Sequence, residues 1–213
     1  MEKVDRIFAS ELLRIGAVLL RPDEPFVWAS GWHSPIYCDN RRILSFPALR
    51  GKVAGWLAGA AAEKYPQAEI VAGVATGAIA HGVLAAERLG KPFLYVRPAP
   101  KDHGTGSQIE GILPRRARVV VVEDLVSTGM SSLAAVQALR EAGADVLGMI
   151  ALFTYGFDLA AGRFAAAGVE LTTLSDYPAL VEEALATGFI RPGDCERLNQ
   201  WRIKPEEYDR DNQ

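Results

Sequence analysis

Two adjacent acids, Glu123 and Asp124, follow four valines at residues 119–122 and precede small and hydroxylated residues at 127–131. The valine run is β-branched and too short for a helix, so it predicts a strand that is buried on both faces and ends at the acids. A helical pattern begins after the small residues, over 133–140. The first amides of a helix lack partners within the helix, so this strand, turn and helix predict a site for an anion such as phosphate.

Carboxylates beside a phosphate site are unexpected, because they repel a phosphate. They become useful when the ligand also carries hydroxyl groups, brings a metal ion or develops positive charge as it reacts. A ribose phosphate that reacts at its anomeric carbon has such hydroxyls, and its transition state develops that charge. The alternative is a strand-end acid followed by an ordinary helix cap. Two adjacent acids next to a hydroxyl-rich turn favour the ligand site.

A second chemically suggestive stretch is the long irregular segment 97–111. Loops of this length are uncommon inside compact domains and are often functional. The segment combines cationic or protonatable groups with glycines that give hinge freedom: Arg97, Lys101, His103, Gly104 and Gly106. It is therefore predicted to close over a polyphosphate and exclude water. For Lys101 the alternative is an ordinary solvated surface lysine.

Placing these residues together requires an alternating framework of strands and helices. Strand patterns occur at 69–74, 93–96, 119–122, 146–153 and 169–173. Helical patterns lie between and after them, at 78–89, 133–142, 157–167 and 177–186. This order predicts a mostly parallel sheet with helices on both faces. Ligands of such sheets bind at the carboxyl ends of the strands, where Glu123 and Asp124 lie. The turn at 75–77 offers further backbone amides to a diphosphate.

The N-terminal part has a different pattern. Helices are expected over 4–16 and, with Pro47 in the first turn, over 47–64. Between them, residues 26–40 mix aromatic, hydroxyl and Asx side chains and predict two short strands joined around Ser30-Gly31. This segment is either a hood that binds a base over a pocket or a plain edge hairpin. The polar tail from Arg191 is expected to pack as a short helix.

Composition limits the classes of protein that remain. A chain of 213 residues with 49% hydrophobic and 23% charged residues fits one globular α/β domain over residues 1–213. The net charge of −3 and the lack of a long basic run argue against nucleic-acid binding. No apolar stretch is long enough to cross a membrane, and the first residues lack a signal-peptide core. A cytoplasmic protein is therefore expected.

The cysteines and histidines do not form a metal-binding pattern. Cys38 and Cys195 are far apart without CxxC spacing, which argues against a zinc site or a disulfide framework and fits a reducing compartment. His33 and His81 have no metal-spaced partner and are interpreted as structural or pocket-lining residues. Neither a P-loop nor the glycine motif of dinucleotide-binding folds occurs.

Three stretches carry a resemblance to a known family. Residues 119–131 resemble the phosphoribosyl-diphosphate motif of type I phosphoribosyltransferases. Residues 26–41 and the sequence Lys-Asp-His-Gly at 101–104 are similar to the hood and catalytic loop of the orotate phosphoribosyltransferases. The motifs follow the order of that family. The resemblance implies an α/β fold with a mostly parallel sheet flanked by helices and a small N-terminal hood contributed by residues 1–45.

The resemblance also implies roles for individual residues. The implied catalytic residues are Lys101, His103 and Asp124. Phosphoribosyl diphosphate is implied to contact Arg97, Lys101, His103, Glu123, Asp124, Leu125, Val126, Ser127, Thr128, Gly129, Met130 and Ser131. Within this set the two acids take the ribose hydroxyls, and the residues after them cradle the 5-phosphate. Orotate is implied to meet Ser127 and the backbone of Tyr37 and Cys38.

The implied reaction transfers ribose 5-phosphate from phosphoribosyl diphosphate to orotate. Mg²⁺ is the implied cofactor and arrives with the diphosphate, with no protein ligand assigned to it. A homodimer is implied, in which loop 97–111 acts across the interface. Two alternatives are a phosphoribosyltransferase for another base and a regulator that senses phosphoribosyl diphosphate. Such a regulator usually adds a basic nucleic-acid surface, and the net charge of −3 argues against one.

The chain departs from the enterobacterial form of this pattern at four places. Pro98 and Ala29 replace lysines, and Thr76-Gly77 replaces a Tyr-Lys pair. Tyr155 lies near the position where an orotate-binding arginine is expected. The partner of the orotate carboxylate therefore stays unassigned at this level.

Overall fold

The computed structural model describes residues 2–28, 31–99 and 107–208 of the chain. Its centre is a six-stranded sheet in the order β10-β9-β8-β5-β6-β7. In that order the strands are Leu171–Asp176, Asp145–Thr154, Arg118–Val126, Ile70–Val74, Phe93–Val96 and Ile109–Glu110. Neighbouring strands are parallel except for β7, which is antiparallel to β6. The predicted mostly parallel sheet is confirmed, and its parallel strands bring their carboxyl ends to one edge.

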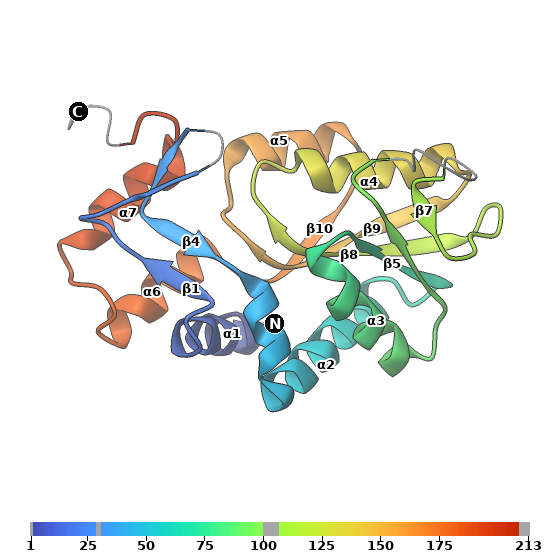
Figure 1. The fold of residues 1–213 in the computed structure, drawn as a ribbon, viewed down its shortest axis with the longest axis horizontal. Helices are drawn as coiled ribbons and strands as arrows, with labels where there is room; N and C mark the ends of the chain where they lie inside the picture. The colour runs from blue at the N-terminus through green and yellow to red at the C-terminus, as the bar shows by residue number, and fades with distance from the viewer. Residues whose placement is uncertain (1, 29–30, 100–106, 209–213) are drawn as a thin grey trace.

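Helices cover both faces of the sheet, as predicted (Figure 1). On one face lie α2 (Pro47–Lys64) and α3 (Gly77–Leu89), and on the other lie α4 (Met130–Glu141) and α5 (Asp158–Ala166). The four valines of β8 are at most 1% exposed. Because both faces of this central strand are covered, a continuous apolar run is what the position demands.

The hood lies at one end of the molecule, beside the N- and C-terminal helices (Figure 1). The predicted hairpin is present as β2 (Phe26–Val27) and β3 (His33–Ser34), and residues 29–30 between them lie outside the described residues. A second antiparallel pair joins β1 (Val18–Leu20) to β4 (Ile36–Cys38), and η1 (Asn40–Ser45) follows. The flanking helices are α1 (Glu2–Arg14), α6 (Tyr177–Ala186) and α7 (Asp194–Ile203).

The C-terminal helix forms part of the core beneath the hood. Trp201 of α7 is fully buried, and its ring centroid lies 5.7 Å from Trp28, 5.5 Å from Tyr155 and 5.2 Å from Phe157. Its indole Nε1 donates to the carbonyl oxygen of His33 at 3.2 Å. The short helix expected in the tail is confirmed. The polar composition of the tail did not indicate that Trp201 would be a buried core residue packed against the hood.

Two boundaries predicted from the sequence are wrong. β8 does not end at the acids but continues to Val126, which pairs with Thr154 of β9. Strand pairing uses backbone groups, so a polar side chain does not terminate it. The segment 97–111 is not irregular throughout, because β7 pairs with β6 and extends the sheet. Lys101, His103, Gly104 and Gly106 lie outside the described residues.

Within the described part of the chain, no helix is both long and apolar enough to span a bilayer.

Candidate functional site

The two acids lie near the carboxyl end of β8 but differ in environment. Glu123 is 4% exposed, and its carboxylate accepts hydrogen bonds from the Ser132 hydroxyl at 2.8 Å and from the Asp124 amide at 3.0 Å. Burial, together with the neighbouring charge of Asp124, raises the pKa of Glu123 well above its ordinary value. Asp124 is only partly buried. It is therefore the acid that a ligand can reach most directly.

The carboxylate of Asp124 packs against the start of α3. A Cβ atom placed on Gly77 would stand 1.9 Å from Oδ2 of Asp124, so only glycine fits there. The turn after β5, predicted to offer amides to a diphosphate, thus lies directly beside the acid. One helical turn further, His81 is 1% exposed, and burial lowers its pKa while the charge of Asp124 opposes this shift. His81 is a buried neighbour of the acid.

The turn between β8 and α4 is held in place by three contacts from β9 and α5. The carbonyl oxygen of Val126 accepts from the Thr154 hydroxyl at 3.0 Å, and that of Thr128 accepts from Nη1 of Arg163 at 2.8 Å. Gly129 has φ +78°, and a Cβ there would lie 3.0 Å from the Phe164 ring. A fixed turn before a helix without a side-chain cap leaves amides free to bind an anion.

The residues predicted to cradle the phosphate differ in what they present. Ser127 and Thr128 are partly exposed, and Ser131 is exposed at the start of α4. Val126 is fully buried, so only its backbone can contact a ligand. Met130 is 65% exposed and lies in the first turn of α4. The predicted cradle is therefore made by backbone amides and hydroxyls, with little contribution from apolar side chains.

The hood positions Tyr37 and Cys38 lie on β4. The Tyr37 ring is 43% exposed and packs 5.7 Å from Phe26, between ring centroids. Burial, with the nearby charges of Asp124 and Asp39, raises the pKa of the Cys38 thiol. The thiol therefore stays neutral. It donates to Oδ1 of Asn40, whose Nδ2 donates to the Asp124 carbonyl oxygen, so this part of the hood is connected to the acid.

Tyr155 lies near the position where the resemblance implies an orotate-binding arginine. It is 3% exposed, and its ring lies 5.3 Å from that of Trp28. Burial raises the pKa of its hydroxyl, which stays protonated at neutral pH. Tyr155 therefore packs as a buried aromatic residue beneath the hood and offers no positive charge to a ligand carboxylate.

Asn40 was not identified from the sequence as a site residue. It is 1% exposed, and its side-chain Nδ2 donates to the Asp124 carbonyl oxygen at 2.7 Å across a sequence separation of 84 residues. The only sequence signal was its membership of the Asx pair that ends the hood segment. A contact between residues 84 positions apart leaves no local sequence pattern, so it could not be predicted from the sequence.

Arg97 lies at the carboxyl end of β6, on the same edge of the sheet as the acids. Its amide donates to the backbone carbonyl oxygen of Gln108 at 2.9 Å, and its own carbonyl oxygen accepts from Nε2 of the Gln108 side chain at 2.7 Å. Its guanidinium is 4.0 Å from the Glu110 carboxylate. β5 separates this strand from β8. The structure therefore brings Arg97 to the predicted edge, whereas Lys101 and His103 lie outside the described residues.

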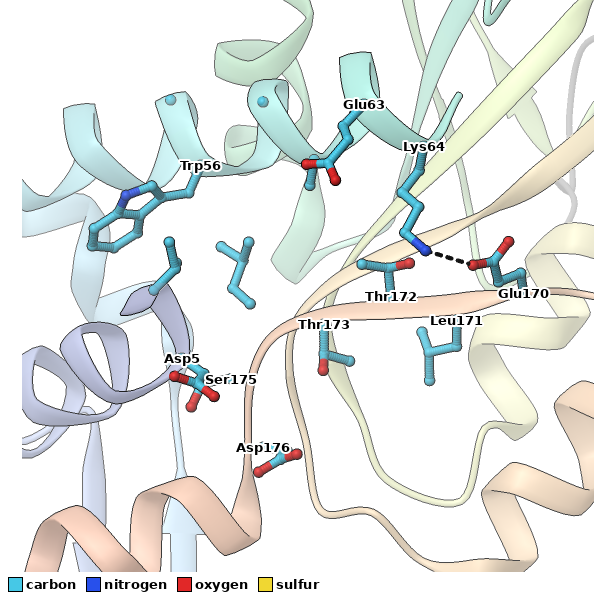
Figure 2. Close-up of a pocket in the computed structure, with 15 residues that line it drawn as sticks. Asp5, Trp56, Glu63, Lys64, Glu170, Leu171, Thr172, Thr173, Ser175 and Asp176 are labelled. Carbon is cyan, nitrogen blue, oxygen red and sulfur yellow. Dashed lines mark hydrogen bonds and ion pairs between the residues drawn. The ribbon is translucent and has the colours of Figure 1, made fainter. Parts of the chain in front are cut away.

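A cavity of about 650 Å³ lies elsewhere, between α1, α2 and β10 (Figure 2). Its charged lining is mostly acidic, and its lysine, Lys64, pairs with Glu170 at 3.1 Å. An acidic lining disfavours phosphates, and none of the predicted site residues lines it. In the described ranges, no group of three or more His, Cys, Asp or Glu side chains is arranged to hold a metal ion.

Comparison with known proteins agrees with this geometry. The sequence profile of the phosphoribosyl transferase domain matches residues 40–166. The orotate phosphoribosyltransferase of Porphyromonas gingivalis is 49% identical over 208 residues, covering 98% of this chain and 99% of the relative. That of Bacillus subtilis is 49% identical over 204 residues, covering 96% and 94%.

Solved structures give the same result. Orotate phosphoribosyltransferase from Aeropyrum pernix superposes with a TM-score of 0.75 at 34% identity, covering 86% of this chain and 99% of that one. The Mycobacterium tuberculosis enzyme in complex with 5-phospho-α-D-ribosyl 1-diphosphate has a TM-score of 0.65 at 25% identity, covering 83% and 98%. The chain therefore belongs to the phosphoribosyltransferase family, and within it to the orotate phosphoribosyltransferases.

Proposed function

We propose that this protein transfers ribose 5-phosphate from 5-phosphoribosyl 1-diphosphate to orotate, giving orotidine 5′-monophosphate and diphosphate in pyrimidine biosynthesis. The observation that carries the proposal is the junction of the hood with the acidic strand, where Asn40 bonds to Asp124. The near full-length similarity to orotate phosphoribosyltransferases supports the same activity. We further propose that residues 1–213 act as one domain, to which residues 1–45 contribute the hood.

In this proposal the turn after β8 holds the 5-phosphate. The amides at the start of α4 and the hydroxyls of Ser127, Thr128 and Ser131 are the donors, and Leu125 and Val126 contribute backbone groups. Glu123 and Asp124 take the ribose hydroxyls. Because Glu123 is buried and already bonded to Ser132, Asp124 supplies most of the accessible negative charge.

The reaction is a displacement at the anomeric carbon. The bond from that carbon to the diphosphate oxygen breaks and a bond to the pyrimidine ring nitrogen forms, while the proton of that nitrogen passes to the departing diphosphate. Positive charge develops on the ribose ring, where the Asp124 carboxylate stabilises it, and negative charge develops on the leaving diphosphate. The chain contributes positioning and electrostatic stabilisation, and no covalent intermediate with the protein is needed.

Orotate is proposed to lie between the hood and the turn after β8. The backbone of Tyr37 and Cys38 meets the pyrimidine from one side, and Ser127 meets it from the other. The Trp28–Tyr155 ring pair forms the apolar floor under this part of the hood. A flat aromatic ligand fits such surroundings, because planar rings stack on aromatic side chains.

Mg²⁺ is the proposed cofactor, and the oxygen ligands available at the site, a carboxylate and the substrate phosphates, suit this ion. Mg²⁺ usually binds one or two carboxylates together with substrate phosphates and waters, so an all-protein cage is not required. Asp124 is the partly exposed carboxylate beside the proposed diphosphate turn. When bound, the ion would supply positive charge to the diphosphate oxygens.

We also propose that the protein is a homodimer in which Lys101 and His103 reach the diphosphate of the partner subunit. Arg97 would act from the end of β6 on the same group. The support is the position of Arg97 at the carboxyl edge of the sheet, where β6 ends and the antiparallel strand β7 begins. Cations at the departing diphosphate stabilise the charge that forms there.

The test is a spectrophotometric assay of orotate consumption with phosphoribosyl diphosphate and Mg²⁺. Orotate should be consumed only when the divalent cation is present, and added orotidine monophosphate with diphosphate should regenerate it. Adenine, hypoxanthine and uracil are assayed in parallel. Turnover of one of these bases without turnover of orotate would contradict the proposal.

A further inference from the structure

Asn40 is joined to three elements that would hold three different parts of the reaction. It lies two residues after the end of β4 in the hood and begins η1. Its side-chain Nδ2 donates to the carbonyl oxygen of Asp124 on β8 at 2.7 Å. The η1 turn that it begins packs against α3, the helix that carries His81. At 1% exposure, Asn40 makes these contacts shielded from water.

The side chain of Asn40 uses both its donor and its acceptor. While Nδ2 donates to β8, Oδ1 accepts from the Cys38 thiol at 3.5 Å. An amide suits this position because it is neutral and offers both kinds of group. A carboxylate would place acceptor against acceptor at the Asp124 carbonyl. An aliphatic residue would leave that carbonyl without its donor, which is costly for a buried group.

The three joined elements correspond to the three parts of the proposed ternary complex. The hood strand carries Tyr37 and Cys38 for the base, β8 carries Asp124 for the ribose, and Gly77 begins the helix beside the diphosphate. A displacement requires the ring nitrogen and the anomeric carbon to be held at near-attack distance. A shift of about 1 Å in such a geometry costs roughly 100-fold in rate.

We propose that Asn40 is a positioning residue that sets the distance between the base pocket in the hood and the ribose-binding acid on β8. The inference rests on the proposed function, because it assigns the base and the ribose to these two elements. Asn40 does not touch the reacting atoms. It acts by fixing the backbone of Asp124 relative to β4, and the packing of η1 on α3 holds that helix beside the same point.

The test compares Asn40→Ala with Ser34→Ala. Ser34 is a fully buried polar residue of the same hood, but its hydroxyl donates to the Ile36 carbonyl at 2.8 Å and so bonds within the hood alone. For Asn40→Ala we expect kcat to fall roughly 10- to 100-fold. The Kd for phosphoribosyl diphosphate with Mg²⁺, measured by calorimetry without base, should stay near the wild-type value. Ser34→Ala should lower Tm and leave kcat unchanged.

Two further variants show how the loss of kcat depends on the hydrogen-bonding group at position 40. Asn40→Ser keeps a hydrogen-bond donor, a hydroxyl, at this position, so its kcat should lie between those of Asn40→Ala and the wild type. If Asn40→Ala does not fold, Asn40→Ser takes its place in the comparison. Asn40→Asp should lose more activity than Asn40→Ala at equal folded fraction, because its carboxylate faces an acceptor and lies near Asp124.

Wild-type kcat in folded Asn40→Ala would overturn the inference. A loss of kcat that only follows the loss of folded protein, as in Ser34→Ala, would overturn it as well. The proposed function is tested separately by the wild-type enzyme with orotate. If the wild type used a different base, the same variants would be compared with that base, because the inference concerns the distance between any base and the ribose.

Discussion

Glu123 and Asp124 are adjacent in the chain, but their side chains have different surroundings in the fold. Alternation along β8 directs them to opposite sides, so Glu123 meets Ser132 of α4 while Asp124 meets Gly77 of α3. The buried acid holds its proton more tightly than usual, and the accessible acid lies where a ligand binds. This difference predicts two different outcomes when each carboxylate is replaced by an amide.

Replacing Asp124 with Asn keeps the shape of the side chain and removes its negative charge. We expect turnover to fall by about 30- to 1000-fold, equivalent to ~2–4 kcal/mol of lost transition-state stabilisation, with little change in Tm. Asp145→Asn is the matched control, because Asp145 is exposed at the opposite end of the sheet. A lower Tm with normal activity per folded molecule would show that Asp124 only caps the turn.

Glu123→Gln should change the pH dependence of stability. Because burial raises the folded-state pKa of Glu123, its stabilising contribution is complete below the ordinary value of 4.5 and is lost as pH rises through the folded-state pKa. Glutamine has no proton to lose. The Tm of the variant minus that of the wild type should therefore increase from below pH 4.5 to mildly alkaline pH. A difference that stays constant with pH would contradict the raised pKa.

At the scale of elements, the site depends on how closely α3 approaches β8. The parallel pair β5–β8 places the turn after β5 beside the acids, and Gly77 lets the Asp124 carboxylate rest on the helix backbone. On the other side, Arg163 and Phe164 of α5 fix the turn at 128–129. Both approaches leave no room for a side chain, so glycine is required at each by packing, and at Gly129 also by its positive φ.

Gly77→Ala tests this close approach. The added methyl would stand 1.9 Å from Oδ2 of Asp124, so the carboxylate must move away and activity should fall sharply in a protein that still folds. Gly55→Ala is the control, since nothing lies within 4 Å of its added Cβ in α2. That change should raise stability by about 0.5–1 kcal/mol and leave activity unaltered. Equal activity in the two variants would exclude the proposed packing role of Gly77.

At the scale of the whole molecule, the N-terminal hood and the C-terminal helix α7 pack together, and the hood joins β8. Trp201 near the C-terminus supports Trp28 in the hood, and Asn40 joins the hood to β8. The opposite edge of the sheet, β6 with β7, carries Arg97 and leads into the segment proposed to serve a partner subunit. The proposed active site would thus draw on distant parts of one chain and on a second copy.

A mixing experiment tests the contribution of the second copy. A Lys101→Ala subunit keeps its phosphate cradle, and an Asp124→Asn subunit keeps its loop. Each mutant homodimer should be poorly active. A purified heterodimer combines one intact cradle with one intact loop, so it should regain about half of the wild-type activity per dimer. If the heterodimer is no more active than its parents, or the protein is monomeric by light scattering, the loop does not act across an interface.

The sequence alone determined the fold class and most of the elements. Alternating strand and helix patterns predicted the parallel sheet, because buried parallel strands need continuous apolar runs such as that of β8. The acidic motif, the hood hairpin and the Lys-Asp-His-Gly loop also indicated the family, which the relatives confirm. These features are local: each depends on residue types within a short stretch of chain.

Tertiary structure decided what depends on contacts between distant segments. β8 continues past its acids because β9 offers backbone hydrogen-bonding partners. Trp201, on a helix of the polar tail, is buried because it packs against aromatic side chains such as Trp28 of the hood. The bond from Asn40 to Asp124 spans 84 residues, and the clearance over Gly77 exists only once α3 packs on β8. No local pattern encodes such contacts, since they arise from which elements the fold brings together.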